Sequence, residues 1–147
     1  MTIAHDRDFY AWTQNQAQLL RTGQFDVLDI QQIAEELEDM GRTEKRALES
    51  RLEVLIMHLL KWQYQPNLRF LRMRFSPRSW QLTIREQRLR VQTLLEDNPS
   101  LQPYLSQRID KIYRLAVIAA ERETGLNLFP ETCPYGIEQI LSEDFFD

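Results

Sequence analysis

Hydrophobic residues recur at helical spacing over most of this chain, and the longest regular run lies between Glu44 and Trp62. Apolar side chains there return every three or four residues, which makes one continuous stripe on a helix of 3.6 residues per turn. The stripe contains Leu48, Leu52, Leu55, Leu59 and Trp62. We predict that this segment is the central helix of the fold and that its stripe, Trp62 included, is buried.

Two helices are predicted before this segment. The first runs from about Arg7 to Thr22, between a capping Asp6 and a stop at Gly23, and its buried face contains Phe9, Trp12, Leu19 and Leu20 with Gln16 as one polar position. Asp29 is predicted to cap the second helix, with Gln32 completing a capping box. Its apolar face consists of Ile30, Ile33, Leu37 and Met40. A break near Gly41 is favoured over one kinked rod, because glycine weakens a helix and Thr43 can cap a new one.

Prolines and glycines also set the later boundaries. The central helix should end near Tyr64, because Pro66 disfavours helical backbone at Gln65. Further helices are predicted from Pro77 to about Glu96 and from Leu101 to about Glu123, and a short closing helix carries Ile137, Ile140 and Leu141. The chain therefore predicts an all-α fold: an up-and-down antiparallel bundle of four to five main helices with a short C-terminal helix, in one domain over residues 1–147.

Composition places the chain among ordinary globular proteins. It has 147 residues, of which 43% are hydrophobic and 27% charged, and its net charge of -4 is too small to identify a partner. Cys133 is the single cysteine, which excludes an internal disulfide and a thiolate zinc cluster, and we interpret it as a packed thiol. No apolar run is long enough for a signal or a bilayer span, so we expect a cytoplasmic protein without membrane contact.

Several stretches resemble one bacterial family, that of domain of unknown function 29. They cover nearly the whole chain: DFYAWTQNQAQLLRTGQFDVLD, IAEELEDMGRTEKRALESRLEVLIMHLLKWQYQP, SWQLTIREQR, LEDNPSL, ETGL and FPETCPY. The resemblance implies an all-helical fold and no established activity. In the family pattern QP is soon followed by SW, whereas residues 68–77 lengthen that gap here. A function of this insertion would be peculiar to this member.

A polar seam accompanies the apolar stripe and is the candidate for chemistry. Arg51 and His58 are two helical turns apart, and Glu36 and Glu44 are acids that could pair with them. The spacing is similar to the Arg-x(4–6)-His motif of HEPN-type helical ribonucleases, in which histidine moves a proton and arginine stabilises phosphorane charge. Leu52 departs from the polar residue usual after that arginine. The favoured interpretation is a structural network, and a metal-independent ribonuclease is the alternative.

The acids of the second predicted helix do not make a metal site. With His58 these acids could be a carboxylate and imidazole site, but the Glu-x-x-His pair that marks metal-binding helices is absent. We therefore interpret Glu35, Glu36, Glu38 and Asp39 as a solvated acidic face. We expect no metal and no cofactor. His5 is expected to lie in a disordered start.

A basic, apolar arm follows the central helix, with Arg69, Arg72 and Arg74 interleaved with Phe70 and Phe75. Arginines continue to Arg90, so single-stranded nucleic-acid binding is a second alternative. We favour burial of the arm against the protein, a partner or the same arm of a second chain. The favoured function is therefore a non-enzymatic protein-protein interaction module, in which self-association as a dimer is one form.

Overall fold

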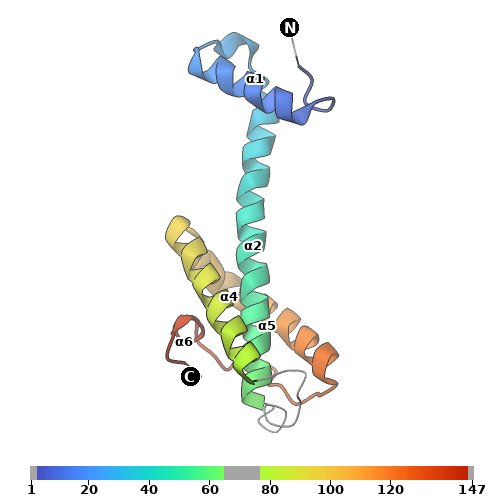
Figure 1. The fold of residues 1–147 in the computed structure, drawn as a ribbon, viewed down its shortest axis with the longest axis vertical. Helices are drawn as coiled ribbons and strands as arrows, with labels where there is room; N and C mark the ends of the chain where they lie inside the picture. The colour runs from blue at the N-terminus through green and yellow to red at the C-terminus, as the bar shows by residue number, and fades with distance from the viewer. Residues whose placement is uncertain (1–2, 65–76, 146–147) are drawn as a thin grey trace. The chain divides into compact units, whose positions relative to one another are not determined.

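Every described element of the chain is helical in the computed structural model, which covers residues 3–64 and 77–145 (Figure 1). The elements are α1 (Phe9–Arg21), the short 3-10 helix η1 (Phe25–Val27), α2 (Ile30–Tyr64), α4 (Pro77–Asp97), α5 (Leu101–Thr124) and α6 (Ile137–Leu141). The all-α prediction is confirmed. Side chains in the second range are described from Ser79 onward, and the predicted arm at 68–75 lies outside the described residues.

Two compact units make up the chain: an N-terminal unit, Met1–Thr43, and a C-terminal unit, Glu44–Asp147. α2 contributes its first turns to the former and its remainder to the latter. We predicted a single domain over residues 1–147. Whether the two units form one domain depends on how they pack together, so this stays a prediction.

α2 is continuous through Gly41, so the favoured break there was wrong. Thr43 does not begin a new helix, because its hydroxyl donates to the carbonyl of Asp39 one turn earlier, at 2.9 Å. An interior glycine costs a helix only about 1 kcal/mol, and the surrounding Glu, Leu, Arg and Lys residues are strong helix formers. The local penalty is therefore too small to end the helix.

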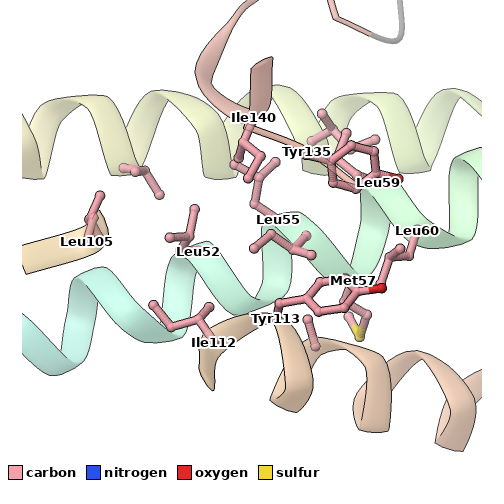
Figure 2. Close-up of a cluster of buried hydrophobic side chains, with 14 of the residues drawn as sticks. Leu52, Leu55, Met57, Leu59, Leu60, Leu105, Ile112, Tyr113, Tyr135 and Ile140 are labelled. Carbon is pink, nitrogen blue, oxygen red and sulfur yellow. The ribbon is translucent and has the colours of Figure 1, made fainter. Parts of the chain in front are cut away.

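The C-terminal unit is a helical bundle around the second part of α2. In Figure 1, α4 runs opposite in direction to α2, and α5 runs opposite to α4, which agrees with the antiparallel order expected from short connections. Figure 2 shows the leucines of α2 meeting side chains of α5 and of the C-terminal segment. Buried residues of this core include the predicted stripe together with Trp80, Ile84, Val91, Leu105, Ile112, Tyr113, Ala116, Tyr135 and Ile140.

The ends of α5 and the closing segment are fixed by specific contacts. Gly125 adopts a left-handed backbone with φ of 71°, and its N–H donates to the carbonyl of Glu121 at 2.8 Å, so α5 ends at Thr124, close to the predicted end near Glu123. Arg88 of α4 is 2% exposed and donates to the carbonyls of Ile140, at 2.8 Å, and Phe145, at 3.2 Å. A buried arginine therefore holds the closing helix against α4.

The N-terminal unit has a small polar centre in place of a large apolar core. Trp12 and Gln16 of α1 are buried, and both bond to Asp29: the indole Nε1 donates to Oδ2 at 2.7 Å, and Gln16 Oε1 accepts the Asp29 backbone N–H at 2.9 Å. Phe9 and Leu20, which were predicted to be buried, are about half exposed. A unit of this size cannot enclose all of its apolar side chains.

Candidate functional site

Arg51 lines a groove between α2 and α4 in the C-terminal unit. The groove holds about 540 Å³ and is bordered by Glu44, Ala47, Arg51, Glu86, Leu89, Arg90, Thr93 and Leu94. Nη1 of Arg51 donates to Oε1 of Gln87 at 3.4 Å, a long hydrogen bond, and its side chain is half-buried. Arg51 therefore faces α4 through a weak polar contact.

His58 bonds to its own helix. Its Nδ1 lies 2.9 Å from the carbonyl oxygen of Val54, which fixes the proton on Nδ1 in the neutral ring. Burial lowers the pKa of His58 below its ordinary value, and the positive charge of Lys61 lowers it further, while Glu123 opposes the shift. The imidazole is therefore neutral near pH 7.

The four residues of the predicted seam do not form one network. Glu36 belongs to the N-terminal unit, where it bonds to His5 at 2.7 Å, and Glu44 is exposed at the rim of the groove. Among the described side chains, no hydrogen bond joins Arg51 to His58. The charged groups that act on His58 are instead Lys61 and Glu123, at the ends of α2 and α5.

His5 makes specific contacts in the structure, so the expectation of a disordered start was wrong at this residue. Its Nδ1 lies 2.9 Å from Oδ1 of Asp6 and its Nε2 lies 2.7 Å from Oε1 of Glu36. The ring packs edge-on against Phe9 and Trp12, with centroid separations of 5.2 and 4.6 Å. The hydrogen bonds to Asp6 and Glu36 raise the pKa of His5 above its ordinary value. His5 thus fastens the start of the chain to α2.

One feature of the sequence could have indicated this cluster. His5, Phe9 and Trp12 are spaced by four and three residues, the spacing of neighbours on one helical face. α1 begins only at Phe9, with Asp8 as its cap in place of the predicted Asp6, yet the three rings still meet. The acidic face of α2 supplies the partner of His5, and sequence alone does not show that long-range pairing.

The first turns of α2 present an apolar surface, which we call the exposed face of α2 and define as Ile30, Ile33, Leu37 and Met40. Ile30, Leu37 and Met40 are 68%, 62% and 64% exposed, and Ile33 is half-buried. The sequence predicted these residues as the apolar face of the second helix. α1 and η1 leave most of this apolar face uncovered. The hydrophobic pattern therefore identified the apolar side of the helix, but it did not show whether other elements cover that side.

The basic stretch has fewer free arginines than the sequence suggested. Arg88 is buried against carbonyl groups, and Arg90 pairs with Glu86 at 3.0 Å on the same helix. Arg85 is exposed. The residues outside the described ranges include the predicted partner-binding arm, Arg69, Phe70, Arg72, Arg74 and Phe75. The described part of α4 therefore presents little unpaired positive charge.

Other candidate chemistry is weak in the described residues. Sγ of Cys133 donates to the carbonyl of Tyr135 at 3.4 Å, and burial raises the pKa of this thiol, which suits a packed residue better than a nucleophile. No group of three or more His, Cys, Asp or Glu side chains in the described ranges could hold a metal ion. None of the described helices is long and apolar enough to cross a membrane.

Comparison with known proteins gives one match. Neither the curated proteins nor the solved structures include a match to this chain. A family model with the description "Domain of unknown function DUF29" matches residues 4–146, which is nearly the whole chain and includes both units. The chain therefore belongs to the DUF29 family.

Proposed function

We propose that this protein is a non-enzymatic helical interaction module and that the exposed face of α2 is its contact surface. The observation that carries the proposal is the exposure of three large apolar side chains, each more than 60% exposed, on one side of one helix. Contiguous apolar surface of this kind on a soluble protein ordinarily marks a contact site.

The rest of the N-terminal unit supports the same conclusion. Its other exposed large apolar residues are Phe9, Tyr10, Leu20, Phe25 and Val27. A stable fold would gain free energy by covering such residues, at about 25 cal/mol for each Å² of apolar surface removed from water. The unit retains a defined structure through the polar contacts of Asp29 and His5, so the apolar surface is presented by an ordered element.

The arrangement of Arg51 and His58 gives less support to the ribonuclease alternative. General acid-base catalysis needs an imidazole within reach of the reacting group, next to a group that stabilises the developing charge. His58 is largely buried, and the charges that influence its pKa are those of Lys61 and Glu123. Arg51 instead contacts Gln87 on α4. The interaction module remains the better-supported function.

Site-specific photo-crosslinking in cells would test this proposal without assuming a partner. A photoreactive benzoylphenylalanine placed at Leu37 of the full chain should yield a discrete crosslinked product. The matched control is the same amino acid at Leu115, an exposed leucine of α5 in the C-terminal unit. Equal crosslinking at both positions, or none at Leu37, would contradict the proposed contact surface.

A further inference from the structure

The spacing of the exposed face indicates the kind of partner. Ile30, Ile33, Leu37 and Met40 follow one another at intervals of three, four and three residues. This is the a/d spacing of a heptad repeat, which forms a narrow seam suited to packing against a second helix. A partner helix with its own apolar stripe would place its side chains between those of this seam.

The charges on the first turns of α2 indicate the sign of charge that the partner helix should have. Glu35, Glu36, Glu38 and Asp39 occupy the same turns of α2. Arg42 is the one basic residue of α2 within the N-terminal unit, and its guanidinium already pairs with Glu38, at 3.8 Å, and with Asp39. Of these acids only Glu36 borders the seam, and Glu35, Glu38 and Asp39 lie toward the opposite side of the helix. Their negative charge therefore acts on a partner as a field around the helix, and this field favours Lys or Arg on the partner.

The whole unit has the same sign of charge. Residues 1–43 contain eight Asp or Glu and three Arg side chains. Two copies of this unit placed face to face would bring two acidic surfaces together, which opposes self-association through this seam. Nucleic acid and anionic membranes are disfavoured by the same repulsion.

We infer that the exposed face of α2 binds a basic amphipathic helix of another protein, a helix with an apolar stripe at heptad spacing and Lys or Arg beside it. The inference rests on the proposed function and names the chemistry of the partner. Binding buries Leu37 and Met40 in a helix-helix seam. The negative charge of the N-terminal unit then attracts the partner's cations, which mainly sets specificity and association rate.

A designed peptide pair provides the test. The first peptide has three heptads with Leu at a and d and Lys at the flanking positions; the second has Glu in place of each Lys, and a scrambled Lys peptide has the same composition without the stripe. Titration of the 147-residue chain into each fluorescently labelled peptide, followed by anisotropy, should show binding of the Lys peptide alone. Its affinity should fall as salt rises from about 50 to about 300 mM, because flanking charges are screened.

Matched variants assign the binding to the face. The double variant Leu37→Ser with Met40→Ser should lower the affinity for the Lys peptide by at least about tenfold, as expected when central apolar contacts of an interface are removed. The control is Leu115→Ser with Ile118→Ser, which removes two exposed apolar side chains at the same spacing from α5 and should leave binding unchanged. Circular dichroism would confirm equal helix content in both variants.

Several outcomes would overturn the inference. They are no binding of the Lys peptide, equal binding of the scrambled peptide, and equal losses in the two double variants. A wild-type dimer that dissociates in the Leu37 and Met40 variant would instead assign the face to a second copy. If photo-crosslinking at Leu37 succeeds while the Lys peptide fails, the interaction function stands and only the basic helix is excluded.

Discussion

The ammonium group of Lys61 lies 2.5 Å from Oε2 of Glu123 and joins the last turn of α2 to the last turn of α5. The Lys61 side chain is only 7% exposed, whereas that of Glu123 is 50% exposed. The same ammonium lies 5.4 Å from the ring centroid of Trp80, at cation-π distance. A charge is thus buried at one end of the core, where its partners among the described residues are one carboxylate and one indole.

Removal of the carboxylate should cost more stability than removal of the pair's cation. Glu123→Ala leaves the buried ammonium unpaired, and we expect a loss of about 1 to 3 kcal/mol, less than for a fully buried pair because Glu123 is half exposed to solvent. Lys61→Met keeps the aliphatic length against Trp80 without the charge, so a change below about 1 kcal/mol is expected. Urea denaturation of both variants measures the difference, and a larger loss in Lys61→Met would contradict it.

Trp62 should be one of the most costly residues to truncate. It is 9% exposed and its ring meets that of Trp80 at a centroid separation of 6.5 Å. Trp62→Ala is expected to lower the free energy of unfolding by about 3 to 5 kcal/mol, as for other large aromatic residues in cores. Leu82→Ala on exposed α4 surface is the control and should change it by less than about 0.5 kcal/mol. Similar denaturation midpoints for both variants would mean that Trp62 does not support the core.

The two histidines should titrate on opposite sides of pH 6.5. The hydrogen bonds to Asp6 and Glu36 raise the pKa of His5, and burial lowers the pKa of His58 from the same ordinary value of 6.5. The chain has two histidines, so their imidazole proton signals in an NMR titration are assignable from His5→Gln and His58→Gln variants. Two curves with coincident midpoints would contradict the described contacts.

These shifts have opposite consequences for stability. The contribution of His5 is fully present below pH 6.5 and is lost as pH rises through its raised folded pKa. His58 binds a proton more readily in the unfolded chain, so stability falls as pH decreases from 6.5 through its lowered folded pKa. His5→Gln should therefore destabilise mainly at acid pH, and His58→Gln should reduce the loss of stability on acidification. Urea midpoints measured across this pH range test both signs.

Arg51 should prove dispensable for folding, and the protein should leave RNA intact. The guanidinium is half-buried with a long hydrogen bond to Gln87, so Arg51→Ala should cost about 1 kcal/mol, the value of an ordinary hydrogen bond. RNA incubated with the wild type in the presence of a metal chelator should not be degraded. Cleavage that disappears in both Arg51→Ala and His58→Ala would restore the ribonuclease alternative.

Much of the fold was accessible from local sequence signals. Pro77, Leu101 and Gly125 mark helix ends whose causes are confined to a few neighbouring residues, and the structure places the ends there. The buried stripe from Leu48 to Trp62 was equally accessible, because its apolar residues repeat at helical spacing over the whole segment, and the structure buries them. Hydrophobic periodicity and helix-ending prolines and glycines are therefore sufficient to predict helices and their ends where one local effect dominates.

The candidate surface was not accessible in the same way. The pattern of Ile30, Leu37 and Met40 shows which side of the helix would be buried, but burial depends on what other elements cover that side. Likewise, Arg88 appeared in the sequence as one more basic residue, and only the long-range approach of Ile140 shows that it is a buried clamp. The role of His5 depends on Glu36, thirty-one residues away. Long-range neighbours decide these features.

Gly41 offers a direct test of the continuity of α2. A Cβ built on Gly41 meets no atom within 4 Å, so alanine fits at this position without a clash. Alanine is favoured over glycine inside a helix, and Gly41→Ala should raise the free energy of unfolding by about 0.5 to 1 kcal/mol. Denaturation followed by far-ultraviolet circular dichroism measures the change.

The matched control for this substitution is Gly125→Ala. Gly125 also has open space around its Cβ position, but its φ is 71°, in the left-handed region. Alanine pays about 1 kcal/mol there, so this variant should lose stability although the chemical change is the same. If Gly41 instead ended one helix in a left-handed conformation, both variants would be destabilised together. Opposite signs at the two positions therefore require that the backbone at Gly41 is right-handed helix, as expected for an interior position of α2.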